Sequence, residues 1–401
     1  MHGIEMFLCA PKSAPCPCAG AFSGAQALET RSFHRSFPQY APTPLVALKA
    51  LAARLGLERI CVKDESFRFG LNAFKVLGGS YAIGRHIATL LGLEADKLSY
   101  AALTSAQSRR ALGDAVFFTA TDGNHGRGVA WTARELGCRA VVRMPRGTVD
   151  SRVRNIRALG AEVSVENMNY DACVRLAAQQ ARETPGGVLV QDTAWEGYTQ
   201  IPMWIMQGYL TMALEADEQM DAPPTHVFLQ AGVGSMAAAV AAYFAGKYAQ
   251  TPPKIIILEP SAANCFYRSA GRGQIEAVEG DMPTMMAGLA CGEPSPIAWD
   301  ILHALASAFL SCEDTVTEQG MRLLGRPLDG DPAITSGESG AVGTGALWEI
   351  MADAQAREAL ALDERCLLYT SCPQRNRKSR RSICSAGAGS GSGNGGANAR
   401  L

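Results

Sequence analysis

The sequence predicts an α/β protein with two lobes, each built on a doubly wound parallel sheet. Short apolar segments of strand length alternate with longer segments of helical spacing from about residue 115 to 191, and a second cycle begins near residue 226. Two of the strand candidates lead into glycine-containing turns that open a helix. This alternation indicates parallel sheets covered on both faces, with a ligand site in the crevice at the carboxyl ends of the strands.

The individual elements follow from apolar periodicity and from the residues that end each run. Runs of apolar and β-branched residues predict strands at 60–64, 115–121, 140–144, 162–165, 188–191, 226–230, 254–259 and 366–371. Apolar residues at helical spacing predict helices at 45–55, 74–91, 129–136, 151–159, 171–182 and 201–214. Gly56 and Gly160 follow two of these helices as stop signals.

The order of these elements predicts two lobes, and the two ends of the chain differ from the lobes in composition. A large lobe is expected from residues 31–78 and 198–371, and a small lobe from residues 79–197. Residues 1–30 mix Pro, Cys, Ala and Gly without period, so we expect a loose lead-in. Residues 372–401 are basic and then rich in Gly, Ser and Asn, which predicts a disordered or aberrant tail, and we favour a shifted reading frame as its origin.

Composition excludes several classes of protein. The 401 residues carry a formal net charge of −1, so the sequence lacks the excess of positive charge that is typical of nucleic-acid-binding proteins. No apolar run approaches the length of a membrane span, and no secretory signal is recognisable at the N-terminus. The 12 cysteines are scattered and match no paired metal-binding pattern, so we expect a cytoplasmic protein without a metal site.

Lys75 is the first candidate for chemistry. It stands among Phe74, Val76 and Leu77, and Gly78 and Gly79 follow closely. Burial among apolar neighbours lowers the pKa of a lysine, and a lysine with a lowered pKa is a competent nucleophile toward a carbonyl. The alternative is a lysine that lays its methylene stem along a helix and reaches water with its ammonium group.

The segment 63–75, with the glycines that follow it, resembles the diaminopropionate ammonia-lyases, which belong to the pyridoxal-phosphate enzymes of the tryptophan-synthase-β-like type (fold type II). The likeness extends from about Arg31 to Ser371. It implies that Lys75 carries pyridoxal 5'-phosphate covalently, in a crevice between the two lobes. It also implies a homodimer, on analogy alone.

The two turns after predicted strands are candidates for holding this cofactor. The resemblance gives the amide of Asn124 a hydrogen bond to the phenolic oxygen of the cofactor, while an N-cap role is the structural alternative. The second turn opens a helix, and converging backbone N–H groups there favour a phosphate cradle made by Gly232, Val233, Gly234, Ser235 and Met236. A dinucleotide site is the weaker alternative, because it leaves Lys75 unexplained.

Three residues are candidates for contact with the substrate. The resemblance places Asp192 and Tyr170 in the substrate pocket, with Asp192 receiving an amino group; an N-cap for the following helix is an equal alternative for Asp192. Asp122 stands where related dehydratases carry serine. We expect it to bind the second amine of the substrate and to act as a base on the face opposite Lys75, with helix capping as the alternative.

The last predicted cofactor contacts come from the C-terminal third of the chain. The turn that contains Glu338 resembles the wall of the cofactor ring, and the strand 366–371 ends in Thr370 and Ser371. In this fold type a hydroxyl meets the pyridine nitrogen, and the resemblance leaves open which of the two serves. A neutral partner of this kind suits elimination.

The sequence therefore predicts a pyridoxal-phosphate-dependent lyase. Its expected reaction is the α,β-elimination of D- or L-2,3-diaminopropionate to pyruvate and ammonia, with no nucleic-acid or membrane partner. A serine or threonine dehydratase of the same fold is the alternative enzyme. An inactive relative, in which the altered C-terminus leaves the site incomplete, is the alternative from another class.

Overall fold

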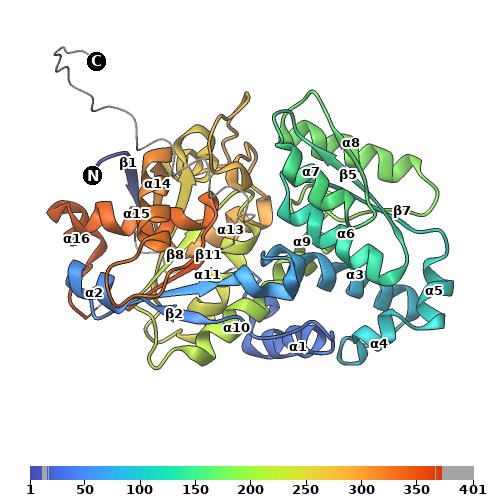
Figure 1. Cartoon of the computed structure of the whole chain (residues 1–401), viewed down its shortest axis with the longest axis horizontal. Helices are drawn as coiled ribbons and strands as arrows, with labels where there is room; N and C mark the ends of the chain where they lie inside the picture. Colours follow the sequence, from blue (N-terminus) through green and yellow to red (C-terminus); the bar gives the residue numbers. More distant parts are fainter. Residues whose placement is uncertain (11–15, 17, 366, 373–401) are drawn as a thin grey trace, which may run out of the picture.

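The computed structural model describes residues 1–10, 16, 18–365 and 367–372, and two sheets organise them in two halves that lie side by side (Figure 1). The larger sheet has seven strands in the order β1-β10-β9-β8-β11-β3-β2. These strands are β1 (Ile4–Leu8), β2 (Leu45–Ala47), β3 (Arg59–Asp64), β8 (His226–Gln230), β9 (Lys254–Pro260), β10 (Ala306–Cys312) and β11 (Leu367–Cys372).

The smaller sheet has four strands in the order β6-β5-β4-β7, and all of its pairings are parallel. Its strands are β4 (Val116–Ala120), β5 (Arg139–Met144), β6 (Glu162–Val165) and β7 (Gly187–Leu189). Strands β2 to β10 thus come from the parts of the chain that the sequence assigned to two lobes, whereas β1 comes from the predicted lead-in. The residue bounds of the lobes themselves stay a prediction.

Helices connect the strands and cover the sheets. Up to β7 they are η1 (Ala19–Phe22), α1 (Gly24–Arg35), α2 (Lys49–Leu55), η2 (Glu65–Gly70), α3 (Lys75–Leu91), η3 (Ala95–Lys97), α4 (Tyr100–Leu103), α5 (Ala106–Leu112), α6 (Asn124–Leu136), α7 (Asp150–Arg157) and α8 (Tyr170–Glu183). After β7 they are α9 (Gln200–Gly208), α10 (Leu210–Gln219), α11 (Ser235–Lys247), η4 (Ser261–Ala263), α12 (Cys265–Arg272), η5 (Ala287–Leu289), α13 (Pro296–Leu305), α14 (Asp314–Gly325), α15 (Glu338–Met351) and α16 (Ala354–Leu360).

The large sheet is buried on both faces. Val227 and Ile255 pack into one hydrophobic cluster with residues of α10, α11 and α13. Their neighbours Phe228 and Ile256 pack on the opposite face with residues of α2, α14, α15 and α16. Because both faces are covered, these strands read as continuous apolar runs, which is how the sequence revealed them.

The expectation of a loose lead-in over residues 1–30 is wrong for the part that the structure describes. Strand β1 pairs antiparallel with β10, from Ile4 opposite Cys312 to Leu8 opposite Ala308. Helix α1 begins after Ser23, whose hydroxyl accepts a hydrogen bond from the backbone N–H of Gln26. The strand is short and half exposed at an edge, so it carries little apolar periodicity.

Two further elements differ from the prediction because tertiary contacts override local spacing. Residues 45–47 of the predicted helix 45–55 form β2, an antiparallel edge strand against β3, and only Lys49–Leu55 is helical. The predicted helix 201–214 is divided into α9 and α10 after Gly208. The large sheet is therefore parallel in its centre and antiparallel at both edges.

Helix α3 is held by close contacts with α6 and α9 that glycines permit. A Cβ atom added to Gly128 of α6 would lie 2.8 Å from Val76 Cα, and one added to Gly208 of α9 would lie 2.4 Å from Leu77 O. A Cβ on Gly78 would lie 2.8 Å from the ring of Tyr209. Contacts of this kind leave no room for a side chain, so the first turn of α3 is fixed between its neighbours.

None of the helices that the structure describes is long and apolar enough to cross a membrane.

We expect Gly208→Ala to destabilise the protein by about 1–3 kcal/mol, because its methyl group would overlap the backbone of α3. Urea unfolding of the full chain measures the loss. Gly246→Ala in α11 is the matched control, since an added Cβ there meets nothing within 4 Å. That control should be neutral or stabilising by up to about 1 kcal/mol; equal losses in both variants would contradict the packing argument.

Candidate active site

One cavity contains most of the residues that the sequence singled out. It lies where β4 and β8 end, between the two sheets, and the turn into α6 and the turn into α11 form two of its walls. The sequence-predicted residues that line it are Lys75, Asp122, Asn124, Tyr170, Asp192 and the loop 232–236. These residues come from distant parts of the chain, so the fold alone assembles them.

Lys75, the first residue of α3, forms an ion pair with Asp192. Its Nζ donates a hydrogen bond to Asp192 Oδ2 at 2.7 Å, and the Asp192 side chain is only 1% exposed. Burial alone would lower the pKa of Lys75, but the Asp192 carboxylate raises it above its usual value. The expectation of a lowered pKa for Lys75 is therefore wrong in this structure, because the buried Asp192 carboxylate outweighs the effect of burial.

Asp192 is held by a second set of contacts. Its Oδ1 accepts hydrogen bonds from the Tyr170 hydroxyl at 3.1 Å and from Gln191 Nε2 at 3.2 Å. Burial would raise the pKa of Asp192, but the Lys75 ammonium, His125 and the Tyr170 hydroxyl hold it below its usual range. The alternative of an N-cap is wrong, because α9 begins only at Gln200, after Thr199.

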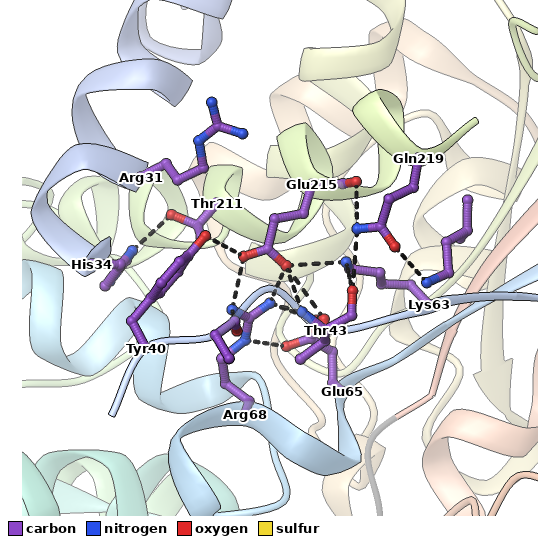
Figure 2. Close-up of polar contacts among 12 residues, drawn as sticks. Arg31, His34, Tyr40, Thr43, Lys63, Glu65, Arg68, Thr211, Glu215 and Gln219 are labelled. Carbon is purple, nitrogen blue, oxygen red and sulfur yellow. Dashed lines mark hydrogen bonds and ion pairs between the residues drawn. The ribbon is translucent and has the colours of Figure 1, made fainter. Parts of the chain in front are cut away.

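The segment that leads into Lys75 is anchored by a buried ionic network (Figure 2). Arg68 Nε donates to Glu65 Oε2 at 2.8 Å, and Arg68 Nη1 donates to Glu215 Oε1 at 2.9 Å. Lys63 Nζ lies 3.0 Å from Glu215 Oε2. All four side chains are at most 2% exposed, and their two positive and two negative charges balance.

The same segment adopts backbone conformations that need support. Phe69 and Asn72 have φ angles of 47° and 56°, in the left-handed region that residues with side chains rarely occupy. The ring of Phe69 stacks on Trp131 of α6, with centroids 5.5 Å apart and an interplanar angle of 12°. The network on one side and this stacking on the other hold the turn that precedes Lys75.

Asp122 forms an ion pair with an arginine of the small lobe and does not cap α6. Arg152 Nη1 lies 3.3 Å from Asp122 Oδ2 and also donates to the Asp122 carbonyl oxygen at 3.2 Å. The capping hydrogen bonds are made by Thr121 Oγ1, which accepts from the N–H groups of Gly123 at 2.9 Å and Gly126 at 3.1 Å. The capping alternative for Asp122 is therefore wrong.

Asn124 and the loop 232–236 lie in the two turns that form walls of the cavity. Asn124 is the first residue of α6, and the N-cap position belongs to Gly123, so the N-cap alternative for Asn124 is also wrong. Gly234 has a φ of 91°, and a Cβ there would lie 2.4 Å from Phe266 Cζ. No side chain caps the N-terminus of α11, which is the arrangement that suits a bound anion.

One predicted cofactor contact, Glu338, does not line this cavity. Glu338 lines a second cavity of about 530 Å³, which shares Asp122 and Tyr170 with the first. Its neighbour Ser339 lines the first cavity instead. Thr370 and Ser371 belong to β11 in the centre of the large sheet, but their side chains lie outside the described part of the chain.

The sequence did not reveal several residues of the site. Gln191 ends a predicted strand without any mark of a site residue, yet its Oε1 accepts from the backbone N–H of Ala120 at 2.9 Å and ties the neighbouring Asp192 to β4. Arg152 and Tyr209 lie inside predicted helices, where nothing marks a residue that faces a cavity. Their roles become visible only in the structure, where they lie beside residues that are distant in sequence.

The chain belongs to the family of pyridoxal-phosphate dependent enzymes, because the model of that family matches residues 37–368. Within that class, the diaminopropionate ammonia-lyase of Salmonella typhimurium LT2 is 53% identical over 330 residues, which cover 80% of this chain and 81% of the relative. That of Escherichia coli K12 is 53% identical, with 81% of each chain covered. The crystal structure of the E. coli enzyme in complex with D-serine matches with a TM-score of 0.88 and 46% identity over 96% of this chain and 97% of that one.

These matches confirm the predicted resemblance, the predicted fold and pyridoxal phosphate as the cofactor. The cavity fits this group on its own evidence. It combines a lysine amine, an asparagine amide and an uncapped helix N-terminus, which are suited to a carbonyl, a phenolic oxygen and a phosphate. The roles of the individual residues stay predictions.

We expect Glu215→Gln to destabilise the protein by about 3–5 kcal/mol, because it leaves Lys63 and Arg68 with an excess of buried positive charge. Chemical unfolding at pH 7 measures the loss. Glu218→Gln on the same helix is the control, since the Glu218 side chain is 51% exposed, and it should cost less than about 1 kcal/mol.

The same variant has a pH signature. Burial would raise the pKa of Glu215, but Arg68 and Lys63 lower it below its usual value. Its contribution to stability is therefore present above the unfolded pKa of about 4.3 and is lost as the pH falls through the folded pKa. Wild-type stability should fall more steeply than that of Glu215→Gln below pH 4; parallel curves would contradict the assignment.

Proposed function

We propose that the chain catalyses the α,β-elimination of ammonia from 2,3-diaminopropionate, in either the D or the L form. The eliminated product then takes up water and gives pyruvate and a second molecule of ammonia. The main support for this proposal is the Asp192 carboxylate, which is 1% exposed and binds the Lys75 ammonium group at 2.7 Å inside the cavity. A wall that already binds an ammonium group suits a substrate with two amino groups.

The residues of the cavity divide the work of binding. Pyridoxal phosphate, when bound, supplies an electron sink that makes the α-proton of an amino acid acidic. Lys75 would hold it covalently, Asn124 would donate to its phenolic oxygen, and the loop 232–236 would hold its phosphate at the N-terminus of α11. Glu338 would lie near the ring wall, and a hydroxyl of Thr370 or Ser371 would meet the pyridine nitrogen.

Proton transfer falls to two side chains on different elements. Lys75 would take the α-proton of the L isomer, and Asp122 would take that of the D isomer from the opposite face. Asp122 is suited to this role because it lines the cavity, with its Oδ2 3.3 Å from Arg152 Nη1. Asp192, fixed by Tyr170 and Gln191, would hold the substrate amino group in position.

We also infer a cytoplasmic homodimer. The buried free thiols support the location, since free thiols persist in reducing compartments; they are Cys61, Cys173, Cys265, Cys291 and Cys312. The dimer rests on the family resemblance. Light scattering of the eluted protein measures its mass directly, and a monomer would contradict this proposal.

Lys75→Ala should abolish both cofactor absorbance and lyase activity. Wild-type protein should absorb in the visible region when loaded with pyridoxal phosphate, and it should release ammonia from diaminopropionate faster than from L-serine or L-threonine. The control is Lys97→Ala, which removes an exposed lysine paired with Asp96. A faster reaction with serine or threonine would make the chain a dehydratase, and wild-type protein without cofactor absorbance would be an inactive relative.

Asp122→Asn should reduce kcat for D-diaminopropionate by about 10²–10⁴-fold, the usual range for loss of a general base, and should affect the L isomer much less. Steady-state kinetics with each isomer measures the difference. Asp150→Asn removes a carboxylate that is 91% exposed and pairs with Arg154 on α7, and it should change neither rate. An equal small loss on both isomers would remove Asp122 from proton transfer.

A further inference from the structure

Tyr209 is a buried residue of the cavity wall that neither the sequence nor the proposed mechanism assigns to a role. It lies at the junction of α9 and α10, where the predicted single helix is interrupted, and its side chain lines the cavity. The residue is only 1% exposed. Its position therefore depends on packing inside the protein and not on solvent.

Packing alone fixes the ring of Tyr209. The ring meets Phe74, the neighbour of Lys75, edge to face with centroids 5.2 Å apart and an interplanar angle of 71°. On the other side it lies against Gly78, where a Cβ would come within 2.8 Å of Tyr209 Cε1 and Cζ. The glycine that follows Lys75 by three residues thus makes room for this aromatic ring.

The hydroxyl of Tyr209 makes no hydrogen bond with any residue that the structure describes, although it is buried. Burial raises its pKa, the Lys75 ammonium lowers it and the Asp192 carboxylate raises it, and the net direction is upward. The phenol is therefore protonated at neutral pH and is a donor close to both charged groups. A buried donor without a partner is costly, so such groups normally meet an acceptor.

We propose that the Tyr209 hydroxyl donates a hydrogen bond to the ligand that fills the cavity, so that Tyr209 is a binding residue. The acceptor is an oxygen or nitrogen atom beside Lys75 and Asp192, supplied either by pyridoxal phosphate or by the amino acid bound with it. This inference rests on the proposed function in one respect, that the cavity binds this cofactor. It adds a contact that the lysine, the asparagine and the glycine loop do not make.

The test compares wild-type protein with Tyr209→Phe, which keeps the ring and removes only the hydroxyl. Both full chains are prepared free of cofactor and reloaded, and the Kd of pyridoxal phosphate is measured by absorbance titration. The Kd of D-serine, an amino acid bound by the E. coli relative, is then measured on the loaded proteins. We expect one of the two constants to rise about tenfold, equivalent to about 1.4 kcal/mol; which of them rises identifies the source of the acceptor.

Thermal unfolding supplies a readout that is independent of activity. Cofactor-free Tyr209→Phe should unfold about 2 °C above cofactor-free wild type, because a buried unpaired donor has been removed, while the ligand-loaded variant should lose this advantage. Tyr243→Phe is the matched control. Tyr243 is also only 1% exposed, and its hydroxyl donates to Asp217 Oδ2 at 2.9 Å, so its loss should destabilise both forms alike and leave both binding constants unchanged.

The outcomes distinguish failure of the proposed function from failure of the role of Tyr209. Wild-type protein that fails to bind pyridoxal phosphate overturns the proposed function and this inference together. Wild-type protein that binds it, with both constants of Tyr209→Phe within twofold of wild type, overturns only the role of Tyr209. If D-serine does not bind wild-type protein, the cofactor constant alone decides. A cofactor-free Tyr209→Phe that is destabilised like Tyr243→Phe shows that the hydroxyl is already satisfied within the protein, and this also overturns the inference.

Discussion

The position of Lys75 depends on how closely three helices approach one another at the start of α3. Gly128 of α6 and Gly208 of α9 contact the backbone of α3 at distances that exclude any side chain. Interiors packed at this density transmit displacement instead of absorbing it. The lysine is therefore fixed between elements of both halves of the molecule, and the cavity keeps its shape because these backbones cannot move apart without opening a void.

A second constraint acts on the chain just before Lys75. The network of Lys63, Glu65, Arg68 and Glu215 joins β3, η2 and α10, so the charges that it buries come from elements far apart in sequence. Buried ion pairs contribute little net stability, since desolvation offsets much of their attraction. Their effect here is geometric, because the contacts among these four groups hold η2 against α10 (Figure 2).

Features encoded by local periodicity were predictable from the sequence. The buried strands, the start of α3 at Lys75 and the two turns at Asn124 and Gly234 follow from runs and glycines that stand beside one another. Strand β1 escaped prediction because it is short and half exposed at an edge. The division between α9 and α10 escaped because it depends on how Gly208 meets α3.

Electrostatics set the limit of sequence reasoning at the site itself. The pKa of Lys75 rises and does not fall, because its partner Asp192 stands 117 residues away and no local pattern pairs them. Similarly, the sequence leaves helix capping open as a role for Asp122, and only the structure shows that Thr121 Oγ1 accepts the capping hydrogen bonds instead. Composition establishes which groups are present, but the sign of a pKa shift depends on which groups the fold brings together.

The two carboxylates of the cavity are held in different ways, and the difference matches the different work proposed for them. Asp192 is almost fully buried and bonded to Lys75, Tyr170 and Gln191, so moving it would expose several groups to an apolar surrounding at once. Asp122 and Arg152 are 21% and 27% exposed and lie 3.3 Å apart, so water offsets much of the energy needed to separate them. A carboxylate that only binds an ammonium group benefits from rigidity, whereas a carboxylate that accepts and returns a proton must tolerate a change of charge. The partly exposed position of Asp122 suits that change, whereas the burial of Asp192 and its hydrogen bonds to three donors oppose it.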